Sequence, residues 1–165
     1  MKKNNIILVI ILVLLFAVAL TLVYLEKRDG KDALVTENKK LSVLKNYNEF
    51  YTVNSCVYRY LTYVQSRNSD SLLKVLDDSF VKNNNINSTN VLNFINVYEG
   101  NINFNSRKMF YEKVNSHITK YYVYGYVEKD IIDDDPLRYE AYYIVNLDSK
   151  NKVFSIMPYS GELFK

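Results

Sequence analysis

The hydrophobic pattern divides the chain into stretches of different character. Residues 6–25 read IILVIILVLLFAVALTLVYL, without a charge, a proline or a glycine, and residues 26–45 are mostly polar. Between 46 and 100 the apolar side chains recur at three- and four-residue steps, whereas from 107 to 165 they occur in short, often alternating runs. These spacings predict a long apolar helix, a connector, a helical segment and a set of β-strands.

The apolar run is long enough to cross a membrane. A helix rises about 1.5 Å per residue, so about 20 residues span roughly 30 Å, the thickness of a bilayer's hydrocarbon core. Lys2 and Lys3 precede the run, and the charges that follow it nearly cancel, which favours a cytoplasmic N-terminus. We therefore expect a single-pass protein of the cell membrane, with 1–5 as a cytoplasmic tail, 6–25 as an uncleaved signal anchor and the remainder extracytoplasmic.

A cleavable signal peptide is the alternative for this N-terminal segment. Ala17, Val18 and Ala19 form a small-x-small pattern behind an apolar core. The apolar run continues through Leu25, however, whereas cleavage sites normally lie in a more polar stretch. An uncleaved anchor therefore explains the sequence better, and cleavage near Ala19 would instead release a secreted domain.

Residues 26–45 predict a polar stalk between the membrane and the folded part. Leu34, Leu41 and Leu44 could mark one sparse helical face, as a lead-in to the domain or as a weak self-association seam that would give a homo-oligomer. A coiled coil needs about three or four heptads, which this stretch lacks. We interpret it as a solvated stalk and place the domain at 46–165.

Amphipathic periodicity predicts three helices in the first half of this domain. The first covers about 46–65. The second follows a cap at Asn68 or Ser69 and carries its apolar stripe through Phe80. The third is shorter and spans about 88–100, where a Ser or Thr can cap its start and a Gly can close its end.

The second half of the domain has the composition of β-strands, rich in Tyr, Val, Ile and Phe between polar turns. After an expected loop over 101–106, four strands are predicted near 108–117, 120–129, 137–147 and 152–159. Short connections make them an antiparallel sheet. Gly125, in the middle of a strand, indicates a bulge or a bend that lets the sheet curve. The predicted fold class is α+β: one N-terminal transmembrane helix, then three helices packed on a curved four-stranded antiparallel sheet.

Alternation within these strands predicts two different faces. One face carries the apolar residues and should pack on the helices. The other face is rich in tyrosine, which is apolar in its body and polar at its tip, as in many interfaces. The candidate interface residues on this face are Tyr122, Tyr124, Tyr126 and Tyr142.

Composition and charge narrow the range of partners. With 48% hydrophobic and 15% aromatic residues, the part beyond the membrane should fold. Lys2 and Lys3 supply most of the net charge of +3, so no basic patch remains to bind nucleic acid. The abundance of Asn, Lys, Ile and Tyr is typical of an AT-rich bacterial genome.

Residues that carry chemistry are sparse. Cys56 and His117 are the only residues of their types, which leaves no internal disulfide, no zinc ligand set and no Cys–His or Ser–His–Asp arrangement to propose. The acidic run Asp133–Asp135 is interpreted as a solvated turn because it lacks the alternation of a calcium loop. We assign no catalytic residue, cofactor or metal. A weaker alternative is catalysis in a pocket, for which the candidates are Tyr122, Tyr124, Glu140 and Tyr142.

The order of predicted elements resembles the nuclear-transport-factor-like (cystatin-like) α+β superfamily. The resemblance covers about 46–165 and rests on three helices followed by a curved antiparallel sheet, with the phrases YYVYGYV and YYIVNLDSKNKVFSIMPY. A short tail, one membrane helix and one outer domain are similar to the single-pass inner-ring subunits of type IV secretion and conjugation machines. This resemblance implies a scaffold role.

Two functions are consistent with these observations. The first is a membrane-anchored extracytoplasmic domain that acts without catalysis, as a protein-interaction, assembly or accessory factor of the bacterial cell envelope. Its partners would be the membrane itself and one or more envelope proteins, with the tyrosine-rich face as the contact surface. The alternative is small-molecule binding in a cone-shaped pocket between helices and sheet.

Overall fold

The computed structural model describes residues 33–36, 39–98, 100–129 and 137–164. The chain divides into two compact units, Met1–Lys40 and Leu41–Lys165. The expected cytoplasmic tail at 1–5 and the expected membrane helix at 6–25 lie outside the described residues. In the ranges that are described, no helix is both long and apolar enough to span a membrane.

The expected stalk contains β-structure where it is described. Strand β1 (Ala33–Thr36) belongs to the first unit, and strand β2 (Lys39–Val43) runs across the boundary into the second. Leu41 and Leu44 are only 1% and 8% exposed, so the folded unit begins before residue 46. The idea of a sparse helical face is wrong for β2, because Leu41 and Val43 alternate with a serine as strand residues do.

Helix α2 (Tyr47–Gln65) confirms the first predicted helix. The side chain of Asn46 caps it by accepting a hydrogen bond from the backbone N–H of Glu49 at 3.2 Å. Tyr, Val, Thr and Asn are weak helix formers, so burial of the apolar stripe is what stabilises this helix. The buried stripe consists of Val53, Cys56, Val57, Tyr60, Leu61 and Val64.

The second predicted helix is interrupted. Helix α3 (Ser69–Val75) ends where Leu76 becomes extended, and helix α4 (Asp78–Asn83) begins after a new cap at Asp77. The backbone of Leu76 forms a parallel bridge with Ile156 at the edge of the sheet. The prediction of one continuous helix is therefore wrong, because this long-range backbone pairing outweighs the local periodicity.

The third predicted helix, over 88–100, is also wrong. Only a single 3₁₀ turn, η1 (Val91–Asn93), forms in this stretch. The side-chain oxygen of Asn87 accepts hydrogen bonds from the backbone N–H groups of Thr89 at 2.9 Å and Asn90 at 3.2 Å. Such local bonds from side chain to backbone compete with the helical hydrogen bonds.

The sheet of the second unit is antiparallel and contains five strands among its described residues, in the order β2-β3-β4-β5-β6. The expectation of four strands omitted β2, in which Ser42 and Val43 pair with β3. Most of the expected loop over 101–106 is also strand, since β3 begins at Ile102 and its Phe104 pairs with Val127 and is buried. The four longer strands are β3 (Ile102–Lys113), β4 (Ile118–Lys129), β5 (Leu137–Asp148) and β6 (Val153–Pro158).

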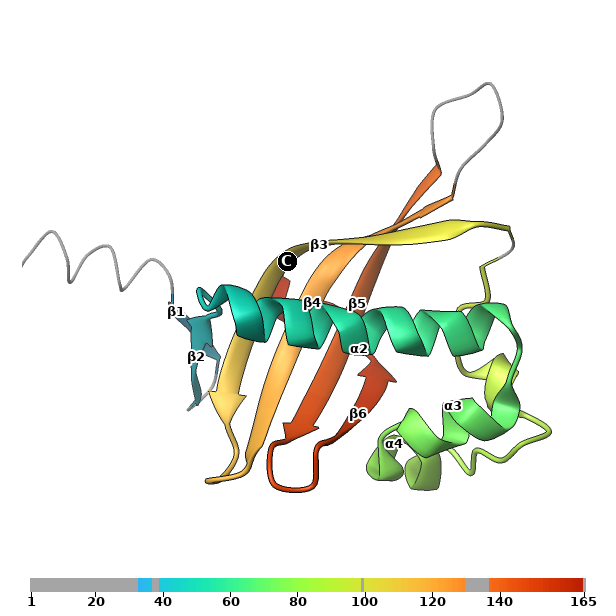
Figure 1. The fold of residues 1–165 in the computed structure, drawn as a ribbon, viewed down its shortest axis with the longest axis horizontal. Coiled ribbons are helices and arrows are strands. Elements are labelled where there is room, and N and C mark those ends of the chain that lie inside the picture. Colours follow the sequence, from blue (N-terminus) through green and yellow to red (C-terminus); the bar gives the residue numbers. More distant parts are fainter. Residues whose placement is uncertain (1–32, 37–38, 99, 130–136, 165) are drawn as a thin grey trace, which may run out of the picture. The chain divides into compact units, whose positions relative to one another are not determined.

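The second unit is an α+β domain in which α2 lies across one face of the curved sheet (Figure 1). The main core fills the space between them. Tyr60 of α2 meets Tyr143 of β5 edge to face, with ring centroids 5.6 Å apart. The side chains of Tyr60, Tyr121 and Tyr143 are each at most 5% exposed, so the interior beneath α2 is filled with protein atoms.

Candidate functional site

The face of the sheet opposite α2 carries the tyrosines that the sequence singled out. In β4, alternate residues from Tyr121 to Val127 are buried on the α2 side, which confirms the predicted alternation. The side chains between them are half-buried on the other face. Cross-strand pairing places Tyr142 of β5 beside Tyr124. We call the four residues on this face the tyrosine cluster: Tyr122, Tyr124, Tyr126 and Tyr142.

Three rings of the tyrosine cluster pack directly against one another. Tyr124 and Tyr142 are stacked, with centroids 5.0 Å apart and planes 16° from parallel. Tyr126 meets the ring of Tyr124 edge to face at 5.6 Å. Stacked and edge-to-face aromatic pairs fix ring orientation, so this part of the surface is ordered before any partner arrives.

Hydrogen bonds join the hydroxyl groups of these three tyrosines to Glu140. Tyr142 donates to Glu140 Oε2 at 2.6 Å, and Tyr124 donates to Glu140 Oε1 at 3.3 Å and to the Tyr126 hydroxyl at 2.9 Å. The carboxylate bond raises the pKa of Tyr142 to about 12, and the bond to Tyr126 together with desolvation raises the pKa of Tyr124. Both phenols are therefore neutral at physiological pH, which suits contact and hydrogen bonding rather than proton abstraction.

Tyr122 stands somewhat apart from the other three. Its hydroxyl donates to Glu112 Oε1 at 3.0 Å, and its ring contacts Tyr159 edge to face at 5.9 Å. Burial, followed by the Glu112 carboxylate, raises the pKa of Tyr122. Tyr122 is thus tied into the domain more firmly than Tyr126.

Arg107 lies on this face at a β-bulge in β3. The register of β3 shifts between Ser106, which pairs with Gly125, and Lys108, which pairs with Tyr124. The extra residue is Arg107, and its guanidinium lies 5.6 Å from the centre of the Tyr126 ring. Ser106 faces α2, where its hydroxyl donates a hydrogen bond to Asn54, so alternation carries Arg107 to the tyrosine face. The bulge then keeps Lys108, which pairs with Tyr124, on that same face.

Sequence reasoning missed Arg107 because the first strand was expected to begin after it. The available signal was Gly125, whose position in the middle of a strand indicated a bulge. The structure places the bulge in the partner strand, directly opposite this glycine.

The last residues of the domain cover part of the tyrosine face. After β6 the chain turns back and ends in a 3₁₀ turn, η2 (Glu162–Phe164). The ring of Phe164 lies 5.5 Å from Tyr124, 5.7 Å from Tyr142 and 5.4 Å from Phe110. Phe110 is 1% exposed on this face. The tyrosine cluster therefore rests on a small second core. Tyr126 is its outermost member, because within the described residues its ring contacts Tyr124 and not Phe164.

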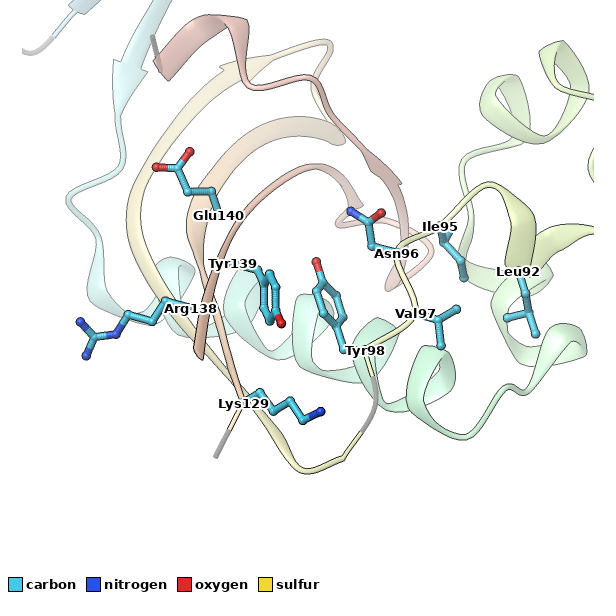
Figure 2. A pocket seen from close by; sticks show the side chains of 9 residues that line it. All are labelled: Leu92, Ile95, Asn96, Val97, Tyr98, Lys129, Arg138, Tyr139 and Glu140. Carbon is cyan, nitrogen blue, oxygen red and sulfur yellow. The ribbon is translucent and has the colours of Figure 1, made fainter. Parts of the chain in front are cut away.

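A wide hollow of about 840 Å³ lies at the other end of β5, between that strand and the loop after η1 (Figure 2). The rings of Tyr98 and Tyr139 face each other across it, with centroids 5.8 Å apart. Arg138 is paired with Glu128 at 2.9 Å, and Glu140 points away from these two rings. The hollow therefore offers an aromatic pair, with the side chain of Lys129 also on its wall.

Cys56 and His117, the two residues with the greatest chemical reactivity, both line a hollow beside α2. Cys56 is 8% exposed within α2, and burial raises the pKa of its thiol to about 11, which leaves it a poor nucleophile. His117 is exposed in the turn between β3 and β4. Across the described ranges, no group of His, Cys, Asp and Glu could hold a metal ion. The acidic run Asp133–Asp135 lies outside those ranges.

Comparison of the chain with protein-family models, with curated proteins and with solved structures gives no match.

Proposed function

We propose that this protein is a membrane-anchored interaction factor of the cell envelope, which binds a protein partner through the tyrosine cluster and Arg107. The observation that carries the proposal is the packed group of Tyr124, Tyr126 and Tyr142 on a sheet face that α2 does not cover. Tyrosine and arginine are the side chains most enriched among the residues that dominate binding energy at protein interfaces.

The chemistry of this surface defines the partner. The rings offer flat apolar area, the hydroxyls and the exposed Arg107 offer hydrogen bonds, and Glu140 adds a negative charge at the edge. The ordered rings lose little conformational entropy on binding. A protein surface with an apolar centre and a mixed polar rim fits this description better than a nucleic acid or a small ligand does.

The proposal places the domain outside the cytoplasm, held by residues 6–25 as an uncleaved single-pass anchor with Lys2 and Lys3 on the cytoplasmic side. Tethering would raise the local concentration of the domain for weak envelope partners. The order of three helices and an antiparallel meander is what supports kinship with the cystatin-like superfamily and a scaffold role akin to inner-ring secretion subunits.

Partner capture by the full-length chain in its own membrane tests this proposal. Tyr126→Ser removes the outermost ring of the cluster, and Tyr47→Ser is the matched control because Tyr47 is 79% exposed on α2. After in-cell cross-linking and purification, we expect Tyr126→Ser to capture at least about 10-fold less partner than the wild type. A loss of roughly 1.4 kcal/mol of binding free energy, as at a binding hot spot, has this effect. The Tyr47→Ser control should capture as much partner as the wild type.

Equal capture by the two variants, with both chains folded, would contradict the proposal. Capture of a second copy of this chain would identify a homo-oligomer as the partner. Capture that falls only in the Tyr47 variant would move the interface to α2.

A further inference from the structure

A groove of about 580 Å³ runs beside the first half of α2, on the face of the sheet opposite the tyrosine cluster. Its other walls are the β3–β4 and β5–β6 turns, which lie at the same end of the sheet (Figure 1). Ser149 joins the two turns, since its backbone N–H and its hydroxyl donate to the carbonyl of His117 at 2.9 and 3.0 Å. Sites for small molecules usually have volumes of about 300–1,000 Å³.

The α2 wall of the groove is polar at both ends. Glu49, Thr52, Cys56 and Arg59 line it and follow one another at steps of three or four residues, which places them on one helix face. At about 1.5 Å per residue, Glu49 and Arg59 lie roughly 15 Å apart along the helix. The groove therefore has an acidic end and a basic end.

The carboxylates of the groove already have donors. Glu49 accepts a hydrogen bond from the hydroxyl of Tyr121. Asp148 accepts from the backbone N–H of Lys150 at 2.9 Å and from the backbone N–H and side-chain amide of Asn151 at 3.1 and 2.6 Å. The bonds to Asp148 build the β5–β6 turn and fix the position of its carboxylate.

The cations of the groove have no such partners. Arg59 and Lys152 both line it, and neither has a carboxylate within ion-pair distance in the described part of the chain. The guanidinium of Arg59 lies over the ring of Phe154, 5.6 Å from its centre, and Phe154 is half-buried. The basic end thus combines an aromatic wall with two cations that form no ion pair with any described residue.

We propose that this groove binds an organic anion with a flat apolar body. The carboxylate or phosphate ester of the ligand lies between Arg59 and Lys152, and its body lies along Phe154 and the α2 face near Cys56. A guanidinium presents paired N–H donors that match both kinds of anion. The site is separate from the tyrosine cluster, and its use does not depend on partner binding there.

Calorimetric titration of the full-length chain in nanodiscs of zwitterionic lipid tests this proposal, with empty nanodiscs as the blank. The probes are 1-naphthoate, 1-naphthyl phosphate and the neutral 1-naphthylmethanol. We expect at least one anion to bind at least about 10-fold more tightly than the alcohol, and the comparison of the two anions identifies which headgroup the groove prefers. Equal affinity for all three probes, or no binding of either anion, would overturn the proposal.

Matched variants localise the site. Arg59→Gln and Lys152→Gln should each weaken anion binding by about 10-fold, whereas Lys150→Gln, in the same turn but outside the groove, should leave it unchanged. Ser55→Trp, at an exposed position on the groove wall, should block binding without removing a charge. Loss of binding in the Lys150 variant, or full binding in the Arg59 variant, would contradict the assignment. Far-ultraviolet circular dichroism confirms that each variant is folded.

Discussion

Gly125 controls the geometry of the tyrosine face from within the core. A Cβ atom at this position would lie 2.6 Å from the carbonyl oxygen of Asn105 and 2.8 Å from the ring of Phe104. Both neighbours belong to β3, just before the bulge at Arg107, whose guanidinium lies over the ring of Tyr126. The close approach of the two strands therefore requires a residue without a side chain.

Gly125→Ala is expected to destabilise the domain by about 1–3 kcal/mol, because the backbone of β3 must shift to admit the methyl group. Urea denaturation of the full-length chain, monitored by tyrosine fluorescence, measures the loss in the free energy of unfolding. Lys150→Ala in an exposed turn is the control and should change stability by less than about 0.5 kcal/mol. A Gly125→Ala chain as stable as the wild type would show that β3 does not approach as closely as described.

Asp77 joins three elements of the domain. Its Oδ1 atom accepts the backbone N–H of Ser79 at 3.0 Å and of Phe80 at 3.3 Å, which caps α4. Its Oδ2 atom accepts the Asn146 amide of β5 at 2.9 Å and the Ser155 hydroxyl of β6 at 3.2 Å. Burial alone raises the pKa of Asp77. Hydrogen bonds from the Ser79 hydroxyl, from the backbone N–H groups of Phe80 and Ser79 and from the Ser155 hydroxyl outweigh burial and hold the pKa below its ordinary value.

Because the folded pKa of Asp77 is lowered, its stabilisation is present above the ordinary carboxyl pKa of about 3.9 and is lost as the pH falls through the lowered value. We expect Asp77→Ala to cost about 1–2 kcal/mol at neutral pH through the lost cap. This difference from the wild type should shrink below about pH 4. Thermal unfolding of the wild type and of the variant, measured from pH 7 to pH 2, gives this stability difference at each pH. As a control, Asp78→Ala at the exposed neighbouring position should have a smaller effect. A difference that stays constant down to pH 2 would contradict the role of the charged carboxylate.

The elements that sequence alone predicts well are those set by local patterns. The stripe of α2 and the alternation of β4 each depend on side chains a few positions apart, so their faces could be assigned in advance. The break at Leu76 could not be assigned, because it depends on pairing with Ile156 far along the chain. The same reason applies to the tyrosine face. Its four tyrosines follow from alternation, whereas Arg107 belongs to a part of β3 that is strand through its pairing with β4, and Phe164 reaches the face by a chain reversal.

The account of the whole molecule requires the domain and the N-terminus to lie on opposite sides of a membrane. Ser160→Cys places a thiol at an exposed position, while the native Cys56 is buried. We expect a membrane-impermeant maleimide to label Ser160→Cys in intact cells and to label Lys3→Cys only after lysis. Labelling of Lys3→Cys in intact cells, with Ser160→Cys protected, would show that the chain has the opposite orientation. If mature chains lack the residues before Ala19, the N-terminal segment is a cleaved signal peptide and not an anchor.

Site-specific photo-cross-linking tests the central claim, that the tyrosine face is where a protein partner binds. A benzophenone amino acid replaces Tyr126 in one full-length chain and Tyr47 in another, and both chains are irradiated in their own membrane. The account predicts a discrete cross-linked product from position 126 and none from position 47. No product from position 126, or the same product from both positions, would contradict it.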